Sequence, residues 1–311
     1  MRSFRQRYLI TTLPPELQRS PLAPVIEAYD DKADKSWGCL FSWTVFSIAC
    51  TAYAAYFVVS EAKSGAAMPL WLQLLPLYVL LPAAVVFLFL LRSFRKCQRI
   101  YVCAQGVMWE RYNRQWGNVT DRRTVQWQQV TAVQSKKVRH YTTDRDNDMQ
   151  SDRYKHTTRT LELLAPTGAP LLKLSGKYHN EFDRGEAFSW IWFAVKAIER
   201  QWCALRLPAM HQHLETAPAA QVPFYPKNDK PIILTRDGLW QGEQFIAWQN
   251  LHVEWRSKDE RLALRDETQK RNVVQRVLNM KEIHVPIGQV PDGCLLVSLL
   301  QQMTGTKLTT W

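Results

Sequence analysis

Two long apolar stretches near the start of the chain constrain its fold more than any other feature. They run from Trp37 to Ser60 and from Pro69 to Leu91, and neither contains a charged residue. At about 1.5 Å of rise per residue, each stretch is long enough as a helix to cross a hydrocarbon layer of roughly 30 Å. The sequence therefore predicts a transmembrane helical hairpin, with helices at 37–60 and 69–91 joined by a short external loop at 61–68.

The basic residues around the two stretches predict an orientation. Arg92, Arg95, Lys96 and Arg99 follow the second stretch closely, and further Lys and Arg residues precede the first. Such residues gather on the cytoplasmic side of a membrane. We therefore expect an inner-membrane, multi-pass protein with a cytoplasmic N-terminal segment at 1–36 and a cytoplasmic C-terminus. The four basic residues are the candidates for setting this topology and for contacting headgroups.

Neither stretch contains Asp, Glu, Lys, Arg or His. Ion pathways and proton relays through membranes normally need ionisable groups within the span. The predicted hairpin is therefore an anchor rather than a transport pathway, and function is expected in the rest of the chain.

The composition suggests which partners that remainder can have. The 311 residues carry 40 Lys and Arg against 28 Asp and Glu, a formal net charge of +12. A basic body held at a membrane most simply faces anionic lipid headgroups. Nucleic acid is the competing partner for a basic surface, but no nucleic-acid-binding signature accompanies the charge. We therefore expect no nucleic-acid partner. The six cysteines form no CxxC pair, which is typical of a reducing compartment and of structural roles.

Short strand-like segments recur after residue 92 in an order that appears twice. In each copy an apolar run, a glycine and a second apolar run precede a Trp-containing strand, a hairpin and a helix, which indicates an internal repeat. A charged segment at 142–158 is predicted to be a solvated loop, and a Pro-rich linker is predicted at 206–230. The predicted helices of the two copies are 181–205, with Asn180 as N-cap, and 291–303.

This order resembles the pleckstrin-homology-like (PH-like) domains of bacterial membrane proteins that carry a two-helix hairpin. The matching residues are Gly106 with Trp127 and Val130, and Gly238 with Trp248 and Leu251. The resemblance implies an α+β membrane protein. Its hairpin would precede two PH-like β-sandwich or barrel modules, at 92–205 and 231–311, each closed by a C-terminal helix.

No catalytic motif accompanies this architecture. The chain has no GxSxG, Walker A, HExxH or GxGxxG sequence, so we expect no enzyme activity, no catalytic residues and no cofactor. Two alternatives involve a metal: His211 with His213, and the acidic residues of the charged segment. The former lack further ligands nearby and the latter alternate with basic residues, so no metal is expected either.

Tryptophan is unusually abundant, with 13 in the chain. Most are expected in cores, but Trp116 and Trp240 lie next to turn glycines and are the candidates for an exposed partner surface. The leading hypothesis is a non-enzymatic, membrane-anchored scaffold that presents tandem modules to a protein partner or to another copy of itself. The alternatives are a sensor of anionic lipid headgroups or of a small ligand, and a membrane-bound enzyme with a site assembled from distant residues.

Overall fold

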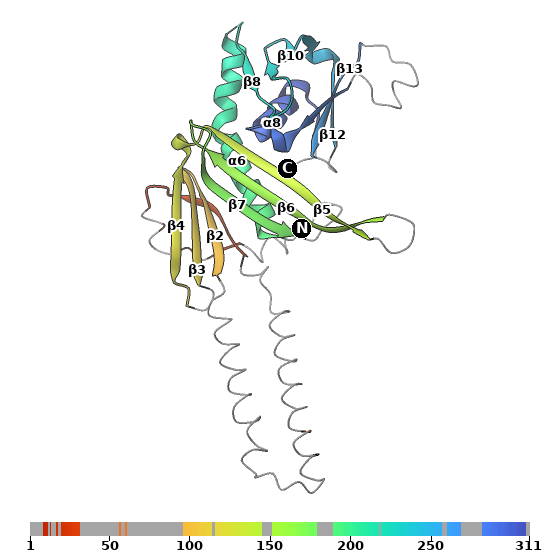
Figure 1. Ribbon diagram of the computed structural model, residues 1–311. Coiled ribbons are helices and arrows are strands. Elements are labelled where there is room, and N and C mark those ends of the chain that lie inside the picture. Colours follow the sequence, from red (N-terminus) through yellow and green to blue (C-terminus); the bar gives the residue numbers. More distant parts are fainter. Residues whose placement is uncertain are drawn as a thin grey trace. The chain divides into compact units, whose positions relative to one another are not determined.

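In the residues that it describes, the computed structural model is mainly β-structure, with four small antiparallel sheets and two α-helices (Figure 1). It describes residues 9–11, 13, 17, 20–31, 56, 60, 96–113, 116–144, 151–178, 189–217, 219–256, 260–268 and 282–308. The described chain forms two compact units, one of residues 1–29, 100–108 and 123–311 and the other of residues 30–99 and 109–122.

The predicted fold class of an α+β membrane protein with a transmembrane hairpin is corrected by this structure. No helix among the described residues is both long and apolar enough to cross a membrane. The longer helix, α6 (Trp190–Thr216), reaches about 40 Å but carries Lys196, Glu199 and Arg200 in its middle turns. The predicted assignment to a membrane and the predicted inner-membrane localisation are corrected on the same ground. The stretches 37–60 and 69–91 lie outside the described residues apart from Tyr56 and Ser60.

Among the described residues, the first repeat, as we call it, contains seven strands and helix α6. One sheet has the order β1-β2-β3-β4 and the other the order β5-β6-β7. In the chain, the 3-10 turn η3 (Trp127–Gln129) connects the two sheets. Its Trp127 is buried, and the indole Nε1 donates to the carbonyl oxygen of Cys103 at 3.1 Å. The strands are β1 (Val25–Asp30), β2 (Lys96–Cys103), β3 (Gly106–Asn113), β4 (Val119–Gln126), β5 (Ala132–Asp144), β6 (Ser151–Leu164) and β7 (Pro170–Tyr178).

The second repeat follows the same order with shorter strands. Its sheets have the orders β11-β10-β9-β8 and β12-β13-β14, and it ends with α8 (Gly293–Thr304). The 3-10 turn η4 (Trp248–Asn250) lies where η3 lies in the first repeat, and a further 3-10 turn, η5 (Ile287–Gln289), precedes α8. The strands are β8 (Val222–Phe224), β9 (Ile232–Leu234), β10 (Gly238–Gln241), β11 (Gln244–Ala247), β12 (Leu251–Arg256), β13 (Arg261–Asp266) and β14 (Ile283–Pro286).

Two glycines mark equivalent positions in the repeats. Gly106 begins β3 and Gly238 begins β10. A Cβ at Gly106 would lie 2.2 Å from the Val125 carbonyl oxygen, and a Cβ at Gly238 would lie 2.3 Å from the Ile246 carbonyl oxygen. Only glycine allows so close an approach of the next strand. Counting from these glycines, Met108 corresponds to Trp240 and Tyr101 to Ile233.

The two repeats differ in the connection between their first two strands. In the second repeat β8 and β9 are joined by residues 225–231. In the first repeat the neighbouring strands β1 and β2 are separated by residues 31–95, so the apolar stretches form an insertion at this connection. Strand β1 also lies within the segment that was predicted to be a separate N-terminal region.

Two further segments differ from prediction. Helix α6 continues through Pro208 to Thr216, and β8 follows it, where the sequence predicted a linker. The expected N-cap, Asn180, lies outside the described residues, and Ser189 occupies the N-cap position. The charged segment 142–158 was predicted to be a loop. Its described residues extend β5 and β6 instead, with Tyr141 paired to Tyr154 and His140 paired to His156 across the strands.

Candidate functional site

An apolar row crosses the outer face of the sheet β8–β11. The strand register places Phe245 opposite Trp240, Trp240 opposite Ile233, and Ile233 opposite Pro223, so the four side chains share one face. The next row, Val222, Leu234, Leu239 and Ile246, points to the opposite face and is buried. We call the set Pro223, Ile233, Trp240 and Phe245 the aromatic row.

The aromatic row is open to solvent in the described structure. Trp240 and Phe245 are 39% and 38% exposed, and their rings pack with centroids 4.9 Å apart. Single exposed apolar residues are common on proteins, but a contiguous set on one sheet face marks an interaction surface more often. The row crosses all four strands of the sheet, so the paired backbones fix the spacing of its side chains.

The corresponding face of the first repeat is covered by the chain itself. Leu17 and Leu22 are buried in one cluster with Tyr101, Cys103 and Met108, and Ile10, Leu13 and Val25 pack against it. The N-terminal segment is also tied to β1, because the Ile10 amide donates to the carbonyl oxygen of Ala28 at 3.0 Å. Met108 is therefore 4% exposed, whereas its equivalent Trp240 is 39% exposed.

The two tryptophans singled out from the sequence are both exposed. Trp116, in the β3–β4 turn, is 60% exposed beside Gly117, which has a positive φ of 71°. Trp240 and Trp116 belong to different compact units. Sequence reasoning missed Phe245, Ile233 and Pro223, which join Trp240 only through the strand register. The alternation of β9 and β10 about Gly238 was the available signal.

The residues predicted for topology and headgroup contact lie in a different setting. Arg92 and Arg95 lie outside the described residues, and Lys96 is exposed at the beginning of β2. Arg99 is turned into the protein: its Nε lies 3.6 Å from Glu110 Oε2, and its guanidinium lies 4.0 Å from the centre of the Tyr112 ring. Arg99 therefore has a structural role.

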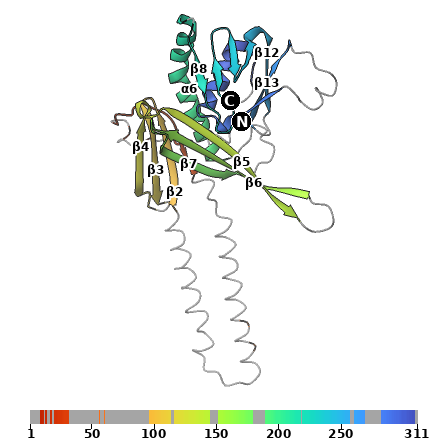
Figure 2. The ribbon, with the colours of Figure 1, turned by 45° about the horizontal axis from the view of Figure 1, so that its top comes forward.

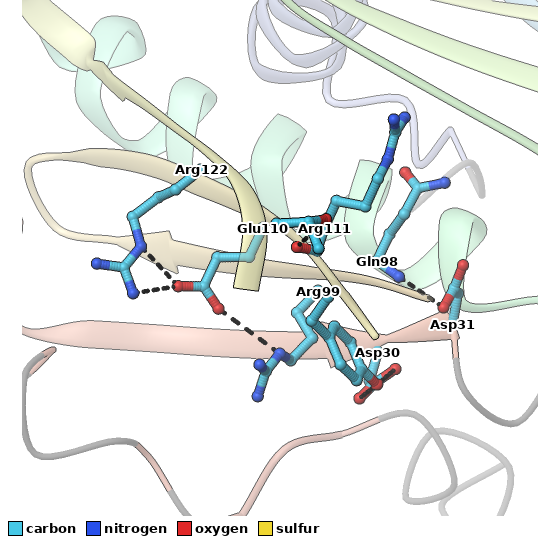
Figure 3. A network of polar contacts seen from close by, with 9 residues as sticks. Asp30, Asp31, Gln98, Arg99, Glu110, Arg111 and Arg122 are labelled. Atoms are coloured by element: carbon cyan, nitrogen blue, oxygen red, sulfur yellow. Dashed lines mark hydrogen bonds and ion pairs between the residues drawn. The ribbon is translucent and has the colours of Figure 1, made fainter. Parts of the chain in front are cut away.

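A polar network surrounds the ends of the insertion (Figure 3). The backbone N–H of Gln98 donates to Asp31 Oδ1 at 2.8 Å, which joins the residue after β1 to β2. Buried Glu110 accepts from Arg122 Nε at 2.8 Å, and the Tyr112 hydroxyl donates to Asp30 Oδ2 at 2.6 Å. Burial and the Asp30 carboxylate raise the pKa of Tyr112 above its usual value. The network joins the end of β1 to β2 and β3 through side-chain hydrogen bonds.

A second charged cluster is buried between the two repeats. Arg159 of β6 is 3% exposed and donates through Nη1 to Glu260 Oε1 at 3.0 Å and through Nη2 to Ser135 Oγ at 3.2 Å. Glu199 of α6 lies 3.8 Å from Arg159 Nη2 and 3.4 Å from Lys196 Nζ. Burial lowers the pKa of Lys196, whereas the cationic neighbours Arg159, Lys196 and Lys137 outweigh burial and lower the pKa of Glu260.

This cluster has a structural role, because its carboxylates Glu199 and Glu260 are engaged by the cations Arg159 and Lys196. Among the residues that the structure describes, no group of three or more His, Cys, Asp or Glu side chains could hold a metal ion. The expectations of no metal, no cofactor and no catalysis stay predictions.

No family model, curated protein or solved structure matches the chain. The resemblance to PH-like domains therefore stays a prediction from sequence, and function has to be argued from the aromatic row and its surroundings.

Proposed function

We propose that the chain is a non-enzymatic binding protein whose second repeat presents the aromatic row to a segment of a polypeptide partner. One observation carries this proposal. The same face of the first repeat is covered by an apolar polypeptide segment that contains Leu17 and Leu22, and the second repeat leaves the equivalent face exposed. A polypeptide segment therefore already covers the equivalent face in the first repeat, and a polypeptide is the ligand expected on the exposed face of the second.

The geometry of the row favours a protein ligand. Trp and Phe provide large contact areas at low cost in side-chain entropy, and aromatic residues dominate the energetics of protein interfaces. Trp240 and Phe245 are fixed by mutual packing and by paired strands, so little ordering is needed on binding. Pro223, in β8 at the sheet edge, lacks a backbone N–H and limits strand addition there, which leaves the side-chain face as the main surface.

The test is site-specific photo-crosslinking in the full chain. A photoreactive phenylalanine analogue replaces Phe245 in producing cells, and a matched chain carries it at the exposed residue Ser175 of β7. We expect discrete polypeptide adducts at position 245, identified by mass spectrometry, that disappear in the Trp240→Ser background. Adducts equal to those at position 175, or adducts formed with lipid or small molecules alone, would contradict the proposal.

A further inference from the structure

A hollow of about 330 Å³ lies beside one end of the aromatic row, between α6 and β8. Figures 1 and 2 both show β8 next to α6. The helix contributes Arg206, Ala209, Met210 and His213, which recur at three- and four-residue spacing and so form one face. The other wall is formed by Gln221, Val222 and Pro223, so Pro223 belongs both to the row and to the hollow.

The lining of the hollow combines apolar and basic character. Ala209, Met210, Val222 and Pro223 provide apolar surface, and Arg206 and His213 provide nitrogen groups, while none of the lining residues carries a carboxylate. The Arg206 guanidinium lies 5.2 Å from the centre of the Trp202 ring, which restricts its position. Asp292 is close enough to interact with Arg206 electrostatically, but its Oδ1 already accepts from Val133 N and Trp202 Nε1.

We propose that the partner segment bound along the aromatic row continues past Pro223 into this hollow and places a carboxylate on Arg206. The partner is thus an acidic and apolar polypeptide segment, its apolar side chains on the row and an Asp, Glu or C-terminal carboxylate beyond them. This inference depends on the proposed function, because it names the partner class of the same face. A guanidinium held against an aromatic ring suits a planar carboxylate, which it can bind through two N–H groups.

Selection of random peptides on the immobilised full chain tests both steps separately. Peptide pools are enriched in parallel on the wild type, Trp240→Ser, Arg206→Glu and the charge-matched control Lys177→Glu of β7. On the wild type and the control we expect peptides with aromatic or aliphatic residues followed by Asp or Glu. On Arg206→Glu the acidic preference should be lost while the apolar preference remains, and on Trp240→Ser enrichment should fail.

A direct binding measurement completes the test. The affinity of a selected peptide for the wild type should fall about tenfold when its carboxylate is changed to an amide, as expected for the loss of a charge-assisted hydrogen bond. The same change should have no effect with Arg206→Ala. Selected peptides that depend on Trp240 without any acidic preference would overturn this inference and leave the proposed function intact. If no selected peptide required Trp240 for binding, both this inference and the proposed function would be overturned.

Discussion

Asp292 connects three elements through a single carboxylate. It lies in the left-handed region, with φ of 59°, immediately before α8, and its Oδ1 accepts from the Val133 amide at 2.7 Å and from Trp202 Nε1 at 2.8 Å. Its own amide donates back to the Val133 carbonyl oxygen at 2.9 Å. The second repeat is thus hydrogen-bonded to β5 and α6 of the first.

Asp292→Ala should destabilise the protein by about 2–4 kcal/mol, because two largely buried donors lose their acceptor and alanine is strained at positive φ. Asp292→Asn is the matched control, since it keeps Oδ1 and tolerates the left-handed region. Urea unfolding measures both variants. A loss for the alanine variant no larger than for the asparagine variant would refute the role of the acceptor.

Lys137 gives the protein a specific dependence on alkaline pH. Burial lowers the pKa of Lys137 from 10.5 to about 8, an effect that Glu260 opposes and Arg139, Arg159 and Lys196 reinforce. Between about pH 8 and 10.5 the unfolded chain therefore holds this proton while the folded chain has lost it, so stability rises with pH in that window.

Replacing Lys137 by Met should remove that rise. We expect the wild type to gain on the order of 1–2 kcal/mol relative to Lys137→Met between pH 7.5 and about 10, allowing for partial exposure. Lys136→Met, at the exposed neighbouring position, should follow the wild type. Urea unfolding at fixed pH steps measures the difference. Parallel pH profiles for the wild type and Lys137→Met would contradict this assignment.

The sheets β1–β4 and β8–β11 carry equivalent residues with opposite surroundings. Met108 is enclosed by the N-terminal segment, so Met108→Ser should cost about 2–4 kcal/mol through lost burial and an added hydroxyl. At the equivalent position Trp240→Ser should cost less than about 1 kcal/mol, because the side chain is exposed. Thermal and urea unfolding of the two variants check this contrast, and similar losses at both positions would argue against it.

The order of strands around Gly106 and Gly238 could be predicted from sequence, because glycine and short apolar runs act locally. The extension of α6 through Pro208 could not. Leu214, only 1% exposed, is buried beyond the proline, and packing of this kind can outweigh the lost backbone hydrogen bond. The charged strand ends after Tyr141 were also missed, because cross-strand pairs depend on register. One such pair is His140 with His156, whose ring centroids lie 4.4 Å apart.

In the candidate site, too, the sequence did not predict contacts that depend on strand register. Trp240 was identified because a glycine turn follows it, but its neighbours come from three other strands and their contact depends on pairing. The membrane prediction used hydropathy and length alone. The structure corrects it in the part of the chain it describes, where the longest helix carries charges in its middle turns.

The cluster around Arg159 joins the two repeats through a buried ion pair. Arg159 belongs to β6 of the first repeat, whereas Glu260 precedes β13 of the second and has a positive φ of 47°. Glu260 and Glu199 outweigh burial and raise the pKa of Arg159 above its usual range. Removing one member of a buried ion pair leaves an uncompensated charge, and this costs about 3–5 kcal/mol.

We therefore expect the wild type to unfold in one cooperative transition, and Arg159→Met or Glu260→Gln to lose about 3 kcal/mol or more. The double variant should lose less than the sum of the two, with a coupling energy of about 1–3 kcal/mol, because both charges are then absent. Calorimetry and urea unfolding of the four proteins provide these values. If the junction couples the repeats, Arg159→Met should also split the transition into two. Additive losses with one unchanged transition would show that the repeats are held together by other contacts, such as those of Asp292 with Val133 and Trp202.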